Sequence, residues 1–291
     1  MALWKASVCS PSSIKRHASC CITTTFVRHY TFSSNDIVPE VASTSPTYRL
    51  LYFNLRGAAE PIRYMLALCK EPYHDIRYPM TASAKGFGID TMFLQHKEQG
   101  TFDANMGQLP ILQVVGLSNS QQNSELQIMQ VGQSHSIMRF LAHRHDLFGT
   151  NEWERAKIDI IYECVRDIKA KWFKVKQNSN SDNQFLSKKR FLEQDLVVAC
   201  AQLEKVIGLS SASVWLVGNR VSMADVVVYS MLTSHHVSLM TGSPNNFFDG
   251  ADPSLLQNSY QLCPRIKASI ENVAKIKEIR EWEEKRPDTF G

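Results

Sequence analysis

Long apolar runs are missing from this chain. No uninterrupted apolar stretch reaches about 18 residues, the length that a membrane-spanning helix needs. Apolar residues nevertheless make up 44% of the 291 residues, and charged residues make up 21%. This is the composition of a globular protein rather than of a disordered one. The sequence therefore excludes a spanning helix and allows one large domain or two ordinary ones.

Net charge is also scarce once the first segment is set aside. The chain has 32 Lys and Arg against 28 Asp and Glu, a formal charge of +4. Four of the cations fall within residues 1–35, where no acid occurs before Asp36. The other 28 cations balance the 28 acids. Such a neutral body offers no electrostatic footprint for nucleic acid, so we expect no nucleic-acid partner.

Paired cysteine motifs and metal-ligand spacings are absent from the sequence, although it contains seven cysteines. Three lie in the first segment, and the other four are far apart, at Cys69, Cys164, Cys200 and Cys263. No CxxC occurs, so the pattern predicts neither a zinc site nor a disulfide framework. Free thiols in a reducing compartment explain the four best, and we expect no metal cofactor.

The first segment reads as a targeting sequence. Residues 1–35 are basic, rich in Ser and Thr, and free of acids, and they lack the compact apolar core of a secretory signal. Arg28, three residues before a cut after Tyr30, resembles a mitochondrial processing site. We therefore interpret residues 1–46 as a transit peptide and a polar linker, and expect a mitochondrial protein. The alternative is the disordered tail of a cytoplasmic protein.

Residues 47–148 carry mixed strand and helix signals. Strands are expected at 48–53, within the stretch EPYHDIRYP, at 109–115 and at 126–131, with amphipathic helices at 60–69 and in SHSIMRFLAHRH. Residues 81–106 are harder to read, and only DTMFLQHKE is predicted to be helical. The polar stretch GLSNSQQNSE predicts a surface loop.

Residues 149–291 show only helical periodicity. The stretches WERAKIDIIYECVRDIKAKW and QFLSKKRFLEQDLVVACAQLEKVI each predict a long helix, and the polar sequence QNSNSDN separates them. Ser222 followed by Asp225 predicts a capping box at the start of another, strongly apolar helix. A mixed half followed by an all-helical half predicts two packed domains with a boundary near residue 149.

The turn after the first strand is unusual. In YRLLYFNLRGAAEPIRYML, a plain strand-to-helix connection needs only the glycine, yet Tyr, Asn and Arg stand beside it. This stretch, followed in order by GQLPILQV, GQSHSIMRFLA and VGNRVSMADVVVYSML, resembles the glutathione transferases. The turn is most similar to that of the sigma class, which includes glutathione-dependent prostaglandin D synthases. The resemblance covers about residues 47–288, with extra residues around 81–106 and 117–125.

The resemblance implies the fold and the activity. It implies a thioredoxin-like N-terminal domain followed by an all-helical C-terminal domain, with glutathione as co-substrate between them. The protein would ionise the glutathione thiol and direct the thiolate at a hydrophobic electrophile near Tyr162, Arg166 and the QNSNSDN loop. The resemblance also implies a homodimer.

Residue by residue, the resemblance assigns two catalytic roles and a set of contacts. Tyr52 matches the hydroxyl donor to the thiolate, and Arg56 matches the arginine that supports it electrostatically. A cis bond between Leu109 and Pro110, after Gln108, would turn the Leu109 backbone toward the cysteinyl part of glutathione.

Further contacts come from the next motif and from the helices. Gln133 and Ser134 match the pair that holds the γ-glutamyl carboxylate, with Ser134 expected to cap its helix. Lys97 is a candidate for the glycyl carboxylate, because Phe93 and Lys97 have the family's spacing for that pair. Asp167 matches the position from which a partner subunit reaches the neighbouring glutathione.

Two rival functions remain open at the level of sequence. A glutathione-dependent isomerase would share every one of these contacts and differ only in its electrophile pocket. A catalytically inactive scaffold or assembly subunit is the second rival, favoured by the two insertions and by the displaced lysine. Intact Tyr52, Gln133 and Ser134 favour an enzyme.

The targeting interpretation makes a direct prediction. If residues 1 to about 30 are removed on import, the mature protein should begin close to Thr31 and co-purify with mitochondria. N-terminal sequencing of the protein isolated from its native cells measures this. A native chain that starts at Met1 and resides in the cytosol would contradict it.

Overall fold

The computed structural model describes most of the chain after the first segment. The described residues are 47–83, 86–117, 126–177, 181–208, 213–233 and 242–289. All of them belong to one of the two units of the chain, Ser43–Gly291. The expected transit peptide and linker, the loop at 118–125 and residues 178–180 of the QNSNSDN loop lie outside the described residues.

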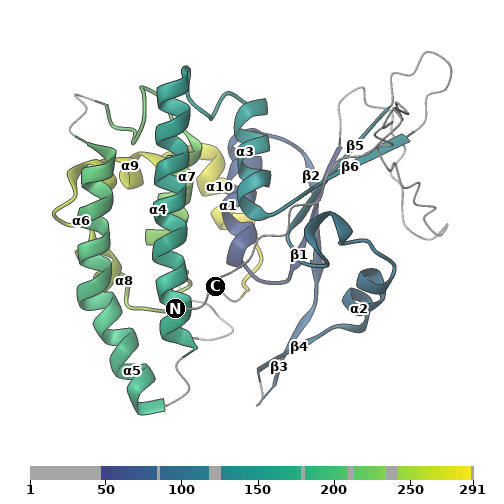
Figure 1. The fold of residues 1–291 in the computed structure, drawn as a ribbon, viewed down its shortest axis with the longest axis horizontal. Coiled ribbons are helices and arrows are strands. Elements are labelled where there is room, and N and C mark those ends of the chain that lie inside the picture. Colours follow the sequence, from purple (N-terminus) through teal and green to yellow (C-terminus); the bar gives the residue numbers. More distant parts are fainter. Residues whose placement is uncertain are drawn as a thin grey trace, which may run out of the picture. The chain divides into compact units, whose positions relative to one another are not determined.

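A four-stranded mixed sheet forms the first part of this unit (Figure 1). Its order is β2–β1–β5–β6, with bounds β1 Thr47–Phe53, β2 Tyr73–Tyr78, β5 Ile111–Leu117 and β6 Leu126–Gly132. β1 and β2 are parallel and are joined through helix α1, Glu60–Leu68, while the other pairs are antiparallel. All four predicted strands are confirmed, but the third begins two residues later than expected, at Ile111.

The segment that the sequence left unclear forms a hairpin and a helix. β3, Met80–Ser83, and β4, Gly86–Ile89, pair as a separate antiparallel two-stranded sheet. Helix α2, Thr91–Glu98, then begins at Asp90, whose side chain accepts a hydrogen bond from the Met92 N–H. The helix predicted in this stretch is confirmed, whereas the hairpin before it was not predicted. A short 3₁₀ turn, Asp103–Asn105, leads to β5.

Helices make up the second part of the described chain. Their bounds are α3 Ser134–Arg144, α4 Glu152–Lys176, α5 Ser181–Arg190, α6 Leu196–Ile207, α7 Met223–Leu232, α8 Pro253–Ser259, α9 Pro264–Val273 and α10 Lys277–Lys285. A π-helical turn, Phe191–Asp195, links α5 to α6, so the predicted second long helix continues through a bulge. The boundary predicted near residue 149 stays a prediction, although no β-strand is assigned beyond Gly132 in the described ranges.

The sheet separates two hydrophobic cores. Leu50 and Tyr52 of β1 belong to the large core that also contains α1, α3 and the helices after residue 149. Leu51, between them, joins Tyr78, Phe93, Phe102 and Ile111 in a small core. This alternation follows the period of two along a strand, which sends neighbouring side chains to opposite faces. The end of β1 is therefore packed on both faces, and this packing holds the turn after it.

The apolar helix α7 lies at the centre of the large core. All ten of its residues are buried, and the predicted capping box of Ser222 and Asp225 is present at its start. The Asp225 carboxylate also accepts hydrogen bonds from the Leu216 N–H at 2.9 Å and from the Ser269 hydroxyl at 2.7 Å. One buried carboxylate thus joins the start of α7 to the preceding loop and to α9.

Replacing Asp225 should destabilise the fold strongly. Asp225→Ala removes the acceptor of all these bonds and leaves buried N–H and O–H groups unpaired, so the free energy of unfolding should fall by about 3 kcal/mol. Urea denaturation followed by circular dichroism measures the loss. Asp252→Ala, which removes an exposed cap whose carboxylate accepts from the Ser254 N–H, is the matched control and should cost less. Equal losses would show that Asp225 acts only as a helix cap.

Candidate active site

The turn after β1 fixes the Tyr52 hydroxyl. Its oxygen accepts a hydrogen bond from the Ala58 N–H at 3.1 Å. Gly57 lies beside it with φ +40°, and a Cβ at that position would be 2.7 Å from the hydroxyl oxygen. Only glycine therefore allows the chain to pass so close to the tyrosine. Because the oxygen accepts from Ala58, its own proton is left to be donated elsewhere.

The Tyr52 phenol is a proton-bearing donor at neutral pH. The residue is only 9% exposed. Burial raises its pKa above the ordinary value, and the Ala58 hydrogen bond and the charge of Arg63 offset this only in part. Ionisation of the phenol is thus disfavoured, and the group is suited to stabilise another anion by hydrogen bonding.

A cavity of about 500 Å³ opens beside this hydroxyl. Its wall comes from the turn after β1, the junction of β6 and α3, one face of α4, α7 and the loop before α8. Its polar and aromatic lining includes Tyr52, Gln133, Ser134, Tyr162, Lys169 and Phe247. The structure therefore brings Tyr52, Gln133 and Ser134 together around one cavity, which the predicted electrophile-pocket residues Tyr162 and Arg166 also line.

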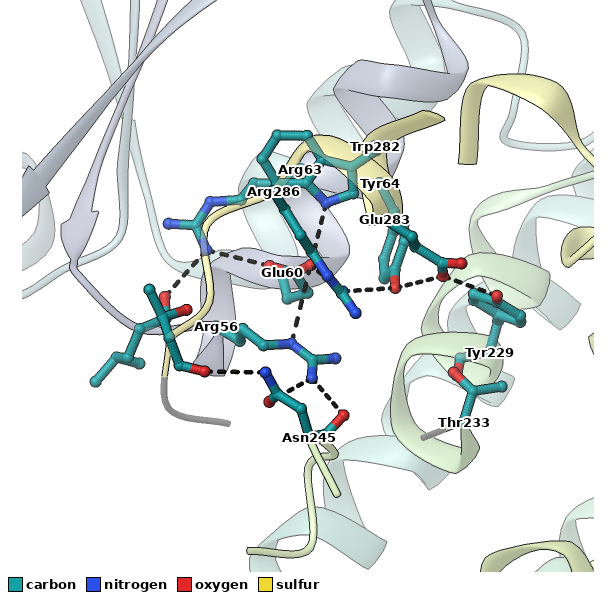
Figure 2. A network of polar contacts seen from close by, with 12 residues as sticks. Arg56, Glu60, Arg63, Tyr64, Tyr229, Thr233, Asn245, Trp282, Glu283 and Arg286 are labelled. Atoms are coloured by element: carbon teal, nitrogen blue, oxygen red, sulfur yellow. Dashed lines mark hydrogen bonds and ion pairs between the residues drawn. The ribbon is translucent and has the colours of Figure 1, made fainter. Parts of the chain in front are cut away.

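Arg56 does not line this cavity. Its side chain is buried, and its Nη1 donates to the backbone carbonyl of Asn245 at 2.5 Å and to the Asn245 Oδ1 at 2.7 Å. Its Nε lies 4.0 Å from the Glu60 carboxylate (Figure 2). Burial lowers its pKa, with a further lowering from Arg286. Arg56 thus joins the turn after β1 to the loop before α8, a contact that the sequence did not predict.

Glu60 is the acid around which this cluster is built (Figure 2). One carboxylate oxygen accepts from the Arg286 Nη1 at 2.7 Å and from the Trp282 Nε1 at 3.1 Å, and the other lies 3.2 Å from the Arg63 Nη1. Burial alone would raise the pKa of this carboxyl, but the arginines around it bring the pKa down to about 2. Glu60 is therefore ionised throughout the neutral range.

The approach to β5 has the predicted backbone geometry. The Leu109–Pro110 bond is cis. The β1–β5 ladder ends at the pair Leu51 and Ile111, so the Leu109 backbone lies beyond it. Pro110 is buried, Leu109 half-buried and Gln108 exposed, and none of the three lines the cavity. Their predicted contacts with glutathione stay predictions.

Asn105 ties this approach to the start of α3. Its Nδ2 donates to the carbonyls of Gln108 at 3.2 Å and Pro110 at 3.1 Å, while its Oδ1 accepts from the Gln133 N–H at 3.1 Å. A Cβ on Gly132 would lie 2.7 Å from the Asn105 Cβ, so the glycine permits the approach. Sequence reasoning missed Asn105 because it lies in a segment without periodicity.

The start of α3 corrects one expectation. Gln133, at φ +64°, precedes the helix, and Ser134 is its first residue, with no side-chain cap. The prediction that Ser134 caps α3 is therefore wrong, because the left-handed turn at Gln133 starts the helix one residue earlier. The Ser134 side chain instead lines the cavity, together with Tyr162 of α4. Ser134 and His135 of the first turn line the cavity, and the N–H groups of a first helical turn are suited to bind an anion.

His135 is a further residue that the sequence did not single out. Its ring stacks on Tyr162 with centroids 3.7 Å apart, and its Nδ1 lies 2.9 Å from the Glu163 carboxylate. Asp159 is 3.4 Å from its Nε2. Asp159 and Glu163 of α4 thus both contact His135. Burial, and then Arg139, lower the pKa of His135 despite these acids.

The remaining candidates lie outside the cavity. Lys97 is exposed, and its Cε would be 3.1 Å from a Cβ placed on Gly107. Phe93, its expected partner in holding a carboxylate, packs in the small core and offers no polar group. Asp167 is exposed on α4. Lys97 thus lies beside Gly107, the residue before Gln108, and the roles of Lys97 and Asp167 stay predictions.

Comparisons with known proteins agree with this architecture. Residues 166–286 match the family model described as the glutathione S-transferase C-terminal domain. Glutathione S-transferase 4 of Caenorhabditis elegans is 35% identical over 194 residues, which cover 65% of this chain and 80% of the relative. Hematopoietic prostaglandin D synthase of Homo sapiens is 28% identical over 254 residues, covering 84% of this chain and 98% of that protein.

A solved structure shows the same fold. The prostaglandin synthase D of Nilaparvata lugens superposes with a TM-score of 0.57 at 24% sequence identity, covering 83% of this chain and 99% of that one. The thioredoxin-like domain and the helical domain predicted from the sequence are thereby confirmed as the fold. Sequence similarity, the matching family model and the fold agree: this chain belongs to the glutathione S-transferase family.

Proposed function

We propose that this protein is a glutathione transferase, which ionises glutathione with Tyr52 and directs the thiolate at an electrophile in the 500 Å³ cavity. The observation that carries the proposal is the Tyr52 hydroxyl. It accepts from the Ala58 N–H, keeps its proton, and lines the same cavity as Gln133 and Ser134. That arrangement aims one donor at the place where a thiolate would develop.

One hydroxyl donor suffices for the chemistry. A free thiol has a pKa of about 8.5, and only its thiolate is a competent nucleophile. Lowering the pKa by about two units takes roughly 2.7 kcal/mol. A hydrogen bond to a charged acceptor supplies about 1.5–3 kcal/mol. Tyr52 would therefore account for most of the activation.

The rest of the site would grip the tripeptide away from the thiol. The Leu109 backbone is suited to pair with the cysteinyl part, and Gln133 with Ser134 at the start of α3 to bind the γ-glutamyl carboxylate. Lys97 for the glycyl carboxylate, Asp167 across a homodimer interface, and a mitochondrial location are parts of the same proposal.

A second function has specific support. The human relative is named a prostaglandin D synthase, and its similarity spans 84% of this chain. A glutathione-dependent isomerase would use the same thiolate but release glutathione unchanged at the end of the cycle. Consumption of free thiol during turnover distinguishes a transferase from an isomerase. An inactive scaffold would show no bound thiolate.

Removing the Tyr52 hydroxyl should raise the pKa of bound glutathione. Tyr52→Phe deletes one charge-assisted hydrogen bond and almost no volume, so the thiol pKa should rise by about one to two units. Turnover at neutral pH should fall roughly ten- to hundredfold, with partial recovery as the pH is raised. Ultraviolet absorbance of the bound thiolate, followed through a pH titration, measures the shift directly.

Tyr73→Phe is the matched control, since this half-buried tyrosine belongs to β2 and does not line the cavity. It should leave the titration unchanged. An unmoved titration in Tyr52→Phe would place the ionising group elsewhere. Wild-type protein that binds glutathione without any thiolate would favour the scaffold.

Asn105 should control glutathione affinity without affecting ionisation. Asn105→Ala releases the carbonyls of Gln108 and Pro110 and the N–H of Gln133 together. We expect the dissociation constant of glutathione to rise about tenfold, equivalent to about 1.4 kcal/mol, while the bound thiol pKa stays unchanged. Calorimetric titration gives the affinity, and the thiolate absorbance gives the pKa.

Asn258→Ala makes the same chemical change on the exposed face of α8 and should alter neither quantity. If the pKa of the bound thiol changes in Asn105→Ala, this residue also orients the turn that carries Tyr52. Unchanged affinity would remove Asn105 from the binding site.

A further inference from the structure

Three cations of α4 face the cavity, and two of them are neutralised. The Arg166 Nη2 lies 2.6 Å from the Glu163 carboxylate, and the Lys176 Nζ lies 2.8 Å from the Asp249 carboxylate. Asp249 is further engaged by Lys188 at 3.6 Å. The carboxylates of Glu163 and Asp249 are therefore already paired with cations other than Lys169.

Lys169 is the third cation, and it lacks an acid. Among the described residues its one partner is the ring of Phe247, whose centroid lies 4.6 Å from the Nζ. A cation over an aromatic face gains only about 0.5–2 kcal/mol, less than a buried ammonium loses in hydration. Burial accordingly lowers the pKa of Lys169 to about 8, which leaves the group mostly charged at neutral pH.

The cavity that this ammonium lines also has an apolar part. Leu55, Pro61, Val165, Ala170, Phe173 and Val227 line it. Lys169 lies seven residues after Tyr162 on α4, a rise of about 10 Å along the helix. Val165 and Arg166 line the cavity between these two positions, so Tyr162 and Lys169 lie at different points along the α4 wall.

We propose that Lys169 binds a carboxylate on the electrophilic substrate, so that the cavity selects electrophiles with an apolar body and an acidic group. The inference rests on the proposed function and adds the class of substrate. An incoming carboxylate would supply the counter-charge that the wall does not provide, in a site where an ion pair is poorly screened. The apolar wall would enclose the body between that group and the reacting carbon.

A matched pair of aryl chlorides isolates the effect of the charge. In 4-chloro-3-nitrobenzoate and its methyl ester, the glutathione thiolate attacks the ring carbon that bears chlorine. A C–S bond forms, the C–Cl bond breaks, and chloride leaves with the bonding electron pair. Nothing is oxidised or reduced, and the carboxylate or ester takes no part in the bond changes. The two substrates therefore differ mainly at the group expected to meet Lys169.

The experiment compares steady-state kinetics of both substrates in wild type, Lys169→Met, Lys169→Arg and Lys171→Met. Lys171 is exposed on the same helix and does not line the cavity, so its variant is the control. We expect Lys169→Met to raise KM for the acid at least tenfold and to change KM for the ester less than twofold. Lys169→Arg should restore the acid to within about threefold of wild type, and Lys171→Met should resemble wild type.

Two results would overturn the inference. A parallel change for acid and ester would show that Lys169 only shapes the cavity. A raised KM for glutathione in Lys169→Met, with the acid-to-ester ratio unchanged, would assign Lys169 to a glutathione carboxylate.

Failure of the proposed function would look different, because wild type would then turn over neither chloride. In that case, calorimetric binding of the unreactive 4-methyl-3-nitrobenzoate and its methyl ester to glutathione-loaded protein decides the matter. If wild type binds the acid more tightly than the ester and Lys169→Met loses this preference, the inference is supported. Equal binding of the two compounds by wild type refutes it.

Discussion

The buried carboxylate of Glu60 is the interaction on which the site depends. It is 3% exposed and lies among Arg56, Arg63 and Arg286, with the Trp282 indole as a further donor (Figure 2). Such a cluster is stable only when it is complete, because removing one charge leaves its partners buried and unpaired. Glu60 therefore fixes the start of α1 against the C-terminal helix α10.

Arg56 connects this cluster to the loop that lines the cavity. Its guanidinium holds Asn245, and two residues further on Phe247 enters the cavity wall, followed by Asp249. The loop that presents these two residues is thus tied to the turn that presents Tyr52. Lys176 holds Asp249 from the other side. One connected set of polar contacts therefore positions both Tyr52, the proposed ionising group, and the part of the wall proposed to meet the electrophile.

Much of the fold was predictable because its signals are local. The largely apolar stretch at 48–53 predicts a strand, and Ser222 with Asp225 predicts a helix start from two residues. Each results from backbone geometry that the neighbouring residues impose. The Leu109–Pro110 bond belongs to a motif whose resemblance to a family implied its cis form.

The parts that were missed depend on contacts between distant segments. Asn105 contacts Gln133 across 28 positions, and Arg56 contacts Asn245 across 189. No periodicity marks such residues, since a lone asparagine in a loop is equally consistent with a plain turn. Ser134 shows the opposite error: its residue type suits a cap, but the left-handed backbone of Gln133 starts the helix one residue earlier.

The position of Arg56 favours a positioning role over the electrostatic role that the family resemblance implies. An arginine beside a thiolate would act mainly through its charge, but this one lies outside the cavity wall, with the Glu60 carboxylate 4.0 Å from its Nε. That carboxylate cancels much of the field that Arg56 would project toward the thiol. Its two hydrogen bonds to Asn245, in contrast, do not depend on that field. Arg56 would therefore serve chiefly to position the turn and the loop, and the proposed mechanism leaves ionisation of the thiol mainly to the Tyr52 hydroxyl.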